Sequence, residues 1–112
     1  MDENKLNVII NDIILGLQDI AKAELEAVVL YGSYARGDYD QESDIDIAVL
    51  LNNDRIGMKK YTDALADLMV DLNLKYDILV SFCCIPYKEY IEKKNILPYY
   101  RNIEQEGVNL IA

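Results

Sequence analysis

The sequence contains no histidine, and its two cysteines, Cys83 and Cys84, are neighbours. The lack of imidazoles excludes Ser–His–Asp triads, Cys–His nucleophile pairs and histidine zinc sites. Two adjacent thiols rarely form a disulfide and are too few for a structural zinc ion. Since the chain shows neither a disulfide framework nor a secretory signal sequence, we expect it to act in the cytoplasm.

Basic residues and long apolar runs are also scarce. Eleven Lys and Arg stand against twenty Asp and Glu, which gives a formal net charge of −9. This balance argues against direct nucleic-acid binding, which needs a basic face, and against docking on an anionic membrane. No apolar run approaches the roughly 20 residues that span a bilayer. The 112 residues suffice for one domain and contain no linker or repeat, so we predict a single domain over residues 1–112.

The hydrophobic pattern predicts alternating helices and short strands. Apolar residues three and four apart predict one helix around Leu6–Leu17 and another around Met58–Leu72. Short apolar runs predict strands over Ala27–Gly32, Asp44–Leu51 and Tyr76–Phe82. Helical turns from Pro86 and Pro98 and a terminal strand over 108–112 complete the chain. This order indicates an α/β fold with a small mixed β-sheet and helices packed on it.

Two aspartates open the second predicted strand. Residues i and i+2 of a strand point to one face, so Asp44 and Asp46 lie side by side while Ile45 enters the core. Carboxylates this close repel, and flanking apolar residues limit their hydration. A divalent cation such as Mg²⁺ would relieve the repulsion, and side chains at this spacing can serve two ions. A solvated acidic turn is the alternative, because five acids lie between Asp38 and Asp46.

A glycine–serine pair directly follows the first predicted strand. Gly32 lets the backbone approach a ligand closely, and the hydroxyl of Ser33 is a donor for a phosphate oxygen. An ordinary turn is the simpler interpretation of this pair taken alone. Arg36 is the nearest cation, and it would either help to hold a triphosphate or pair with one of the neighbouring acids.

The two features together form one pattern, in which Gly32 and Ser33 are followed by ten residues and then by Asp44-x-Asp46. This pattern resembles, residue for residue, the signature of the nucleotidyltransferase superfamily related to DNA polymerase β. The resemblance implies a nucleotidyltransferase-like fold in which the glycine and serine anchor the nucleotide phosphates and the two aspartates hold the catalytic metal ions.

The family places a third carboxylate on a later strand, and Asp77 in YDILV matches that position. Alternation along the predicted strand puts Asp77, Leu79 and Ser81 on one face, from which a carboxylate would reach the metal ions. The resemblance therefore implies that Asp77 is a third catalytic residue and metal ligand.

The short chain is similar to the minimal nucleotidyltransferase (MNT) branch, and GSYARGDYDQESDIDIAVL is similar to MNT antitoxins that pair with HEPN ribonuclease toxins. The resemblance implies transfer of AMP from ATP, with Mg²⁺, to a tyrosine of the toxin. The acidic chain would suit a basic partner, docked on residues Pro86–Ala112. Two alternatives stay open: a binding antitoxin without catalysis, and nucleotidyl transfer to a small molecule such as an aminoglycoside.

Overall fold

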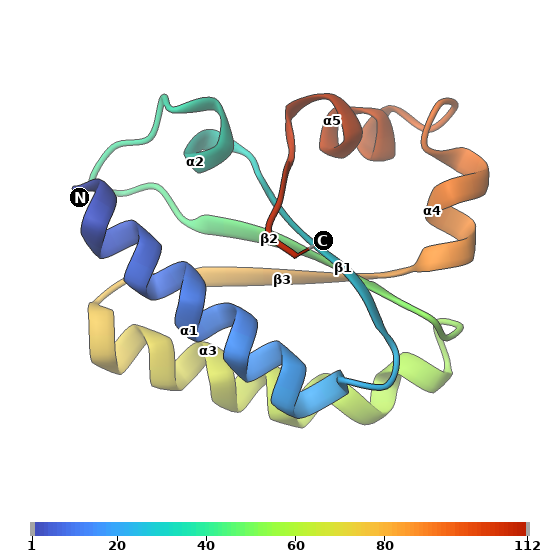
Figure 1. The fold of residues 1–112 in the computed structure, drawn as a ribbon, viewed down its shortest axis with the longest axis horizontal. Helices are drawn as coiled ribbons and strands as arrows, with labels where there is room; N and C mark the ends of the chain where they lie inside the picture. The colour runs from blue at the N-terminus through green and yellow to red at the C-terminus, as the bar shows by residue number, and fades with distance from the viewer. Residues whose placement is uncertain (1, 112) are drawn as a thin grey trace.

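A four-stranded mixed sheet lies between two groups of helices (Figure 1). The computed structural model describes residues 2–111. The strand order is β3–β2–β1–β4. Strand β1 (Leu25–Tyr31) pairs antiparallel with β2 (Ile45–Leu51), which pairs parallel with β3 (Val80–Pro86). The short β4 (Val108–Asn109) pairs antiparallel with β1. The predicted α/β fold with a mixed sheet is confirmed.

One face of the sheet packs against α1 (Glu3–Ala21) and α3 (Thr62–Tyr76), and the 3-10 helix η1 (Gly57–Tyr61) leads into α3. The side chain of Asp2 accepts a hydrogen bond from the backbone N–H of Lys5 at 2.7 Å and so caps the start of α1. The helix buries an apolar stripe at helical spacing, made of Ile9, Ile13, Leu17 and Ala21. This stripe meets the strand residues that point to the same side, including Val28 and Ile47.

The other face carries α4 (Tyr87–Lys93) and α5 (Pro98–Glu106). Their buried side chains pack on strand residues in a second core cluster: Val29, Ala48, Leu50, Ile85, Tyr90, Tyr100 and Ile103. Because strand residues alternate between faces, Asp46 shares the face of Ala48. The aspartate therefore lies on the α5 side of the sheet, near the end of β2 where the chain enters it.

The third strand begins later than the sequence predicts. Helix α3 continues to Tyr76 and ends at Asp77, which has φ 52° and ψ 48° and whose N–H donates to the carbonyl of Asn73 at 2.8 Å. Aspartate tolerates this left-handed conformation better than most residues, so it can end a helix. The prediction of a strand over Tyr76–Phe82 is thus wrong in its first half, since β3 begins at Val80.

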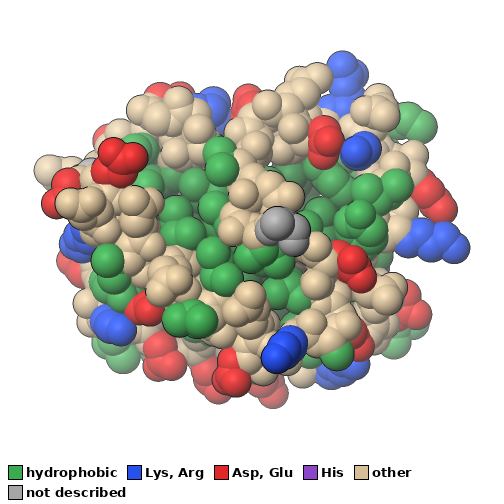
Figure 2. Space-filling view, viewed as in Figure 1, with side chains coloured by type: hydrophobic (Ala, Val, Ile, Leu, Met, Phe, Trp, Pro, Cys, Tyr) green, Lys and Arg blue, Asp and Glu red, His purple; other side chains and the backbone are tan. Residues whose placement is uncertain are grey.

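The face of the molecule seen in Figure 2 carries mixed charge. In Figure 2, acidic and basic side chains are interspersed across the visible face, with apolar side chains between them. Within residues 2–111, no helix combines the length and the apolar character needed to cross a lipid bilayer.

Candidate active site

The site begins at the bend after β1. The chain turns at Gly32, which has φ 75° and ψ −154°, and enters the four-residue helix α2 (Ser33–Arg36). This backbone conformation is essentially restricted to glycine. A Cβ atom at position 32 would also lie 2.5 Å from Oδ2 of Asp46. The backbone conformation therefore requires glycine, and a side chain at position 32 would force the Asp46 carboxylate to move.

Asp46 occupies the centre of a row of three strand residues. It pairs with Tyr31 on β1 and with Ser81 on β3. Burial raises the pKa of Asp46 above its ordinary value, the negative charge of Asp44 raises this pKa further, and the Arg36 guanidinium opposes the rise. The structure thus holds two carboxylates close enough to repel, in a place where at least one is poorly hydrated.

Asp44 immediately precedes β2 and its side chain is exposed. Between the two aspartates, Ile45 is fully buried, and its N–H donates to the carbonyl of Leu79 at 2.9 Å. The start of β2 is therefore fixed by the core and by β3, while both aspartates stay outside the core. The carboxylate oxygens of Asp44 and Asp46 are ligands that suit Mg²⁺, which is held in proteins by one or two carboxylates together with substrate phosphates.

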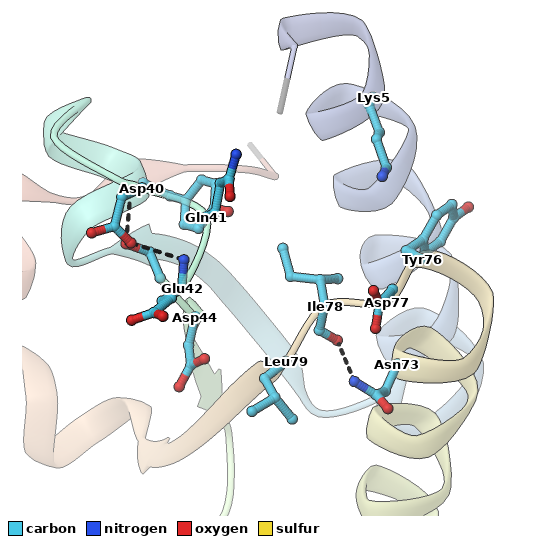
Figure 3. Close-up of a pocket in the computed structure, with 12 residues that line it drawn as sticks. Lys5, Asp40, Gln41, Glu42, Asp44, Asn73, Tyr76, Asp77, Ile78 and Leu79 are labelled. Carbon is cyan, nitrogen blue, oxygen red and sulfur yellow. Dashed lines mark hydrogen bonds between the residues drawn. The ribbon is translucent and has the colours of Figure 1, made fainter.

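Asp77 does not join this pair. It comes from the end of α3 and lies across a pocket of about 440 Å³ from Asp44, with Ile78 and Leu79 between them (Figure 3). Among residues 2–111, no three or more cysteine, aspartate and glutamate side chains are grouped so that they could hold a metal ion. The prediction that Asp77 stands on a strand is wrong, because Asp77 ends α3, and Ser81 is the β3 residue beside Asp46.

Arg36 pairs with two acids. Its Nε lies 3.1 Å from Oδ2 of Asp38, and its Nη1 lies 3.2 Å from Oε2 of Glu106. Of the two alternatives that the sequence leaves open, the structure shows the acid pairing. The guanidinium nevertheless lines a cavity together with Ser33 and Asp46, and its ion pairs are exposed enough to be weak.

That second cavity, of about 380 Å³, lies on the α5 side of the sheet. Gly32, Ser33 and Asp46 line it together with Tyr31 and Tyr99, whose hydroxyl oxygens are 2.8 Å apart. The sequence pattern did not identify these two tyrosines as site residues. Tyr31 directly precedes Gly32 of the motif, and this position could have indicated that its side chain lies near the site. Tyr99 is remote in the chain, and no local pattern connects it with the motif.

Comparisons with known proteins agree with this geometry. Residues 16–104 match the family described as polymerase beta, nucleotidyltransferase. A Methanocaldococcus jannaschii protein named as a candidate protein adenylyltransferase is 33% identical over 107 residues, covering 96% of each chain. A second protein of that organism with the same name is 36% identical over 94 residues, covering 84% of this chain and 87% of the relative.

A solved structure supports the same fold. A chain of a toxin–antitoxin complex crystallised with AMP-PNP superposes with a TM-score of 0.60 and 26% identity, covering 92% of this chain and 73% of that chain. The likeness therefore extends over nearly all of the sheet and helices described above.

Proposed function

Because the chain belongs to the polymerase β family of nucleotidyltransferases, we propose that it transfers AMP from ATP, with Mg²⁺, to a tyrosine of a HEPN ribonuclease toxin and thereby acts as an antitoxin. The closeness of the Asp46 carboxylate to position 32, where a Cβ atom would lie 2.5 Å from Oδ2, carries this proposal, because it joins the phosphate-loop half of the motif to the acidic half. The names of the relatives support AMP transfer to protein, and the toxin–antitoxin complex supports the partner.

The nucleotide would enter the cavity on the α5 side. Gly32 presents bare backbone there, and the Ser33 hydroxyl is a donor for a phosphate oxygen. Arg36 lines the same cavity and would exchange an exposed ion pair with Glu106 for a charge-assisted bond to phosphate. The cavity volume, about 380 Å³, lies within the range of small-ligand sites.

The metal would be held by Asp44 and Asp46. Burial, and after it the negative charge of Asp44, raise the pKa of Asp46, and a divalent cation would offset both effects on the ionised carboxylate. Two ions, the number expected from the sequence, would share these carboxylates with the nucleotide phosphates. When bound, Mg²⁺ would offset the charge that develops on the departing pyrophosphate. Asp77 is not given a place at the metal in this proposal, because among residues 2–111 no three acidic side chains are grouped so that they could hold a metal ion, and Asp77 faces Asp44 from the far side of a pocket.

The other residues of the site would position the nucleotide and the metal ligands. The Gly32 bend and Ser33 would hold the phosphates so that the acceptor hydroxyl reaches the α-phosphorus in line with the leaving pyrophosphate. The core fixes the two aspartates, because Ile45 and Ile47 between and behind them are fully buried. The chain has no histidine, so it cannot use an imidazole as the base.

The acceptor would come from the partner protein. The net charge of −9 suits a basic partner such as a ribonuclease. The segment between α4 and α5 exposes apolar side chains, with Ile96 71% and Leu97 39% exposed. This segment lies within the stretch over which the sequence predicts docking, and it precedes Tyr99, which lines the cavity.

The test is incubation of the protein with α-labelled ATP, Mg²⁺ and the product of the adjacent gene, followed by mass spectrometry of both proteins. We expect AMP on a tyrosine of the partner and release of pyrophosphate. A partner that is neutralised in a stable complex without any gain of AMP would contradict the proposal and favour a binding antitoxin.

A further inference from the structure

The cavity above Asp46 contains a tyrosine of the chain itself. Tyr99 stands in the first turn of α5, and its hydroxyl lies 2.8 Å from that of Tyr31. Tyr31 is the cross-strand partner of Asp46, so both side chains lie on the α5 face of the sheet. The Tyr99 hydroxyl is therefore in the same cavity as Ser33 and Asp46, the residues proposed to hold phosphate and metal.

Tyr99 also differs from the other tyrosines in its surroundings. It is 47% exposed, and its hydroxyl meets another phenol. Several others donate to carboxylates away from this cavity: Tyr61 to Glu24, Tyr76 to Asp12, Tyr90 to Glu104 and Tyr100 to Glu89. Tyr34 is buried and its ring stacks on Tyr39 at 4.3 Å between centroids. Tyr31 lines the same cavity but is less exposed than Tyr99, so Tyr99 is the more accessible of the two tyrosines that face the proposed nucleotide site.

We propose that the chain AMPylates itself on Tyr99 when no protein acceptor fills the cavity. This inference rests on the proposed function. In the transfer, the Tyr99 hydroxyl oxygen bonds to the α-phosphorus of ATP, and the bond from that phosphorus to the bridging oxygen of the β-phosphate breaks. Pyrophosphate leaves with the electron pair, and the phenolic proton is released to water through the cavity. ATP is the sole co-reactant, and nothing is oxidised or reduced.

Self-modification should be slow and self-limiting. Burial, together with hydrogen bonds to Cys83 and Tyr31, raises the pKa of Tyr99, so its hydroxyl releases its proton less readily than an ordinary phenol. An exposed acceptor tyrosine on a partner would lose its proton more readily. Once AMP is attached to Tyr99, it would occupy the cavity that Ser33 and Asp46 line. We therefore expect at most one AMP per chain, and slower turnover of the partner by the modified protein.

The experiment incubates the purified full chain with ATP and Mg²⁺ and measures intact mass, followed by peptide mapping. We expect the mass of one added AMP, located on Tyr99. The amount of AMP incorporated should fall at least about tenfold in Tyr99→Phe. It should stay close to the wild-type amount in Tyr31→Phe, because the acceptor hydroxyl of Tyr99 remains. Label that maps to Tyr31 or to another residue in the wild-type chain would overturn the proposal without recourse to any variant.

Two further arms separate this inference from the proposed function. If the wild-type chain adds AMP to the adjacent-gene product but never to Tyr99, self-modification is refuted and the proposed function stands. If neither protein gains AMP, both fail. The melting-temperature shift caused by α,β-methylene ATP, which cannot donate AMP, should be the same for Tyr99→Phe and for wild type. A lost shift in that variant would show that Tyr99 holds the nucleotide instead of accepting AMP, and would contradict the proposal.

Discussion

The carboxylate of Asp46 occupies the space beside Gly32 that a side chain would need, because its Oδ2 would lie 2.5 Å from a Cβ atom at position 32. Real Cβ atoms essentially never show a contact this short, so a side chain at position 32 would force the carboxylate of Asp46 to shift. The glycine of the motif thus does more than permit a turn, because it also leaves room for the acidic side chain. The bend and the aspartates form one site.

This relationship predicts the effect of Gly32→Ala. The added methyl group would displace the Asp46 carboxylate, and we expect AMP transfer to fall on the order of 100-fold. Gly37→Ala is the matched control, because Gly37 also has a positive φ, 82°, but a Cβ there meets no atom within 4 Å. Gly37→Ala, in the left-handed helical region, should lose about 1 kcal/mol of stability, and Gly32→Ala, in a region essentially restricted to glycine, should lose about 1–3 kcal/mol. An equal loss of transfer in both variants would show that strain, not contact with Asp46, matters.

Asp46→Asn should stabilise the metal-free protein. The pKa of Asp46 is raised in the fold, chiefly by burial, so the folded state binds the proton more tightly than the unfolded state. Its contribution to stability therefore falls as the pH rises through the interval between the unfolded and folded pKa values. At neutral pH the ionised carboxylate opposes folding, and asparagine removes that cost.

Thermal unfolding with EDTA and with Mg²⁺ tests this expectation. The melting temperature of Asp46→Asn should exceed that of wild type in EDTA, and Mg²⁺ should raise it less than in wild type. The exposed Asp67→Asn on α3 serves as the control and should keep the wild-type response to Mg²⁺. A response to Mg²⁺ that survives in Asp46→Asn would place the metal elsewhere.

Asp77→Asn should retain transfer to within a few-fold of wild type. Asp77 ends α3 in a left-handed conformation that asparagine also accepts, so the substitution preserves the helix end. It also faces Asp44 from the far side of a shared pocket, with Ile78 and Leu79 between them. A loss of transfer as large as that of Asp46→Asn, measured at saturating ATP, would restore Asp77 as a catalytic carboxylate.

The sequence predicted the features of the site that are local in the chain. Gly32, Ser33, Asp44 and Asp46 belong to one hairpin, β1–α2–β2, so strand alternation and a fixed spacing were enough to bring them together. Apolar alternation in YDILVSF indicated a strand, but it does not separate the end of a helix from the start of a strand.

Two tertiary features decided the rest of the site. The left-handed Asp77 extends α3 and delays β3 to Val80, which removed the predicted third ligand from the strand. Tyr99 reaches the cavity because α5 packs on the sheet through Tyr100 and Ile103. That packing joins segments that are far apart in the chain, and the spacing of residues along the sequence cannot predict such a contact.

The hydrogen bonds of Glu24 lead us to expect that the free energy of unfolding falls in acid. Glu24 precedes β1, and its carboxylate accepts from Lys60 Nζ at 2.7 Å, from the Tyr61 hydroxyl at 2.6 Å and from Asn53 Nδ2 at 3.0 Å. These bonds, the one from Lys60 first, lower the pKa of Glu24 from 4.5 to about 2. A depressed pKa stabilises the fold above pH 4.5, and this contribution is lost as the pH falls through about 2.

Urea unfolding at a series of pH values measures this loss. Glu24→Gln should flatten the decline in unfolding free energy between pH 4.5 and pH 2 relative to wild type. The exposed Glu26→Gln on β1 should leave the decline unchanged. Parallel curves for wild type and Glu24→Gln would show that the three bonds do not favour the ionised carboxylate in solution.

The rate of AMP transfer by Asp44→Asn and Asp46→Asn tests the central claim most directly. Each protein is incubated with α-labelled ATP, Mg²⁺ and the adjacent-gene product, and incorporated label is counted over time, with Asp67→Asn as the folded control. If the two aspartates hold the metal that serves the nucleotide, each variant should lose at least about 100-fold in rate while Asp67→Asn stays within about twofold of wild type. Transfer at the wild-type rate by either motif variant would contradict the account.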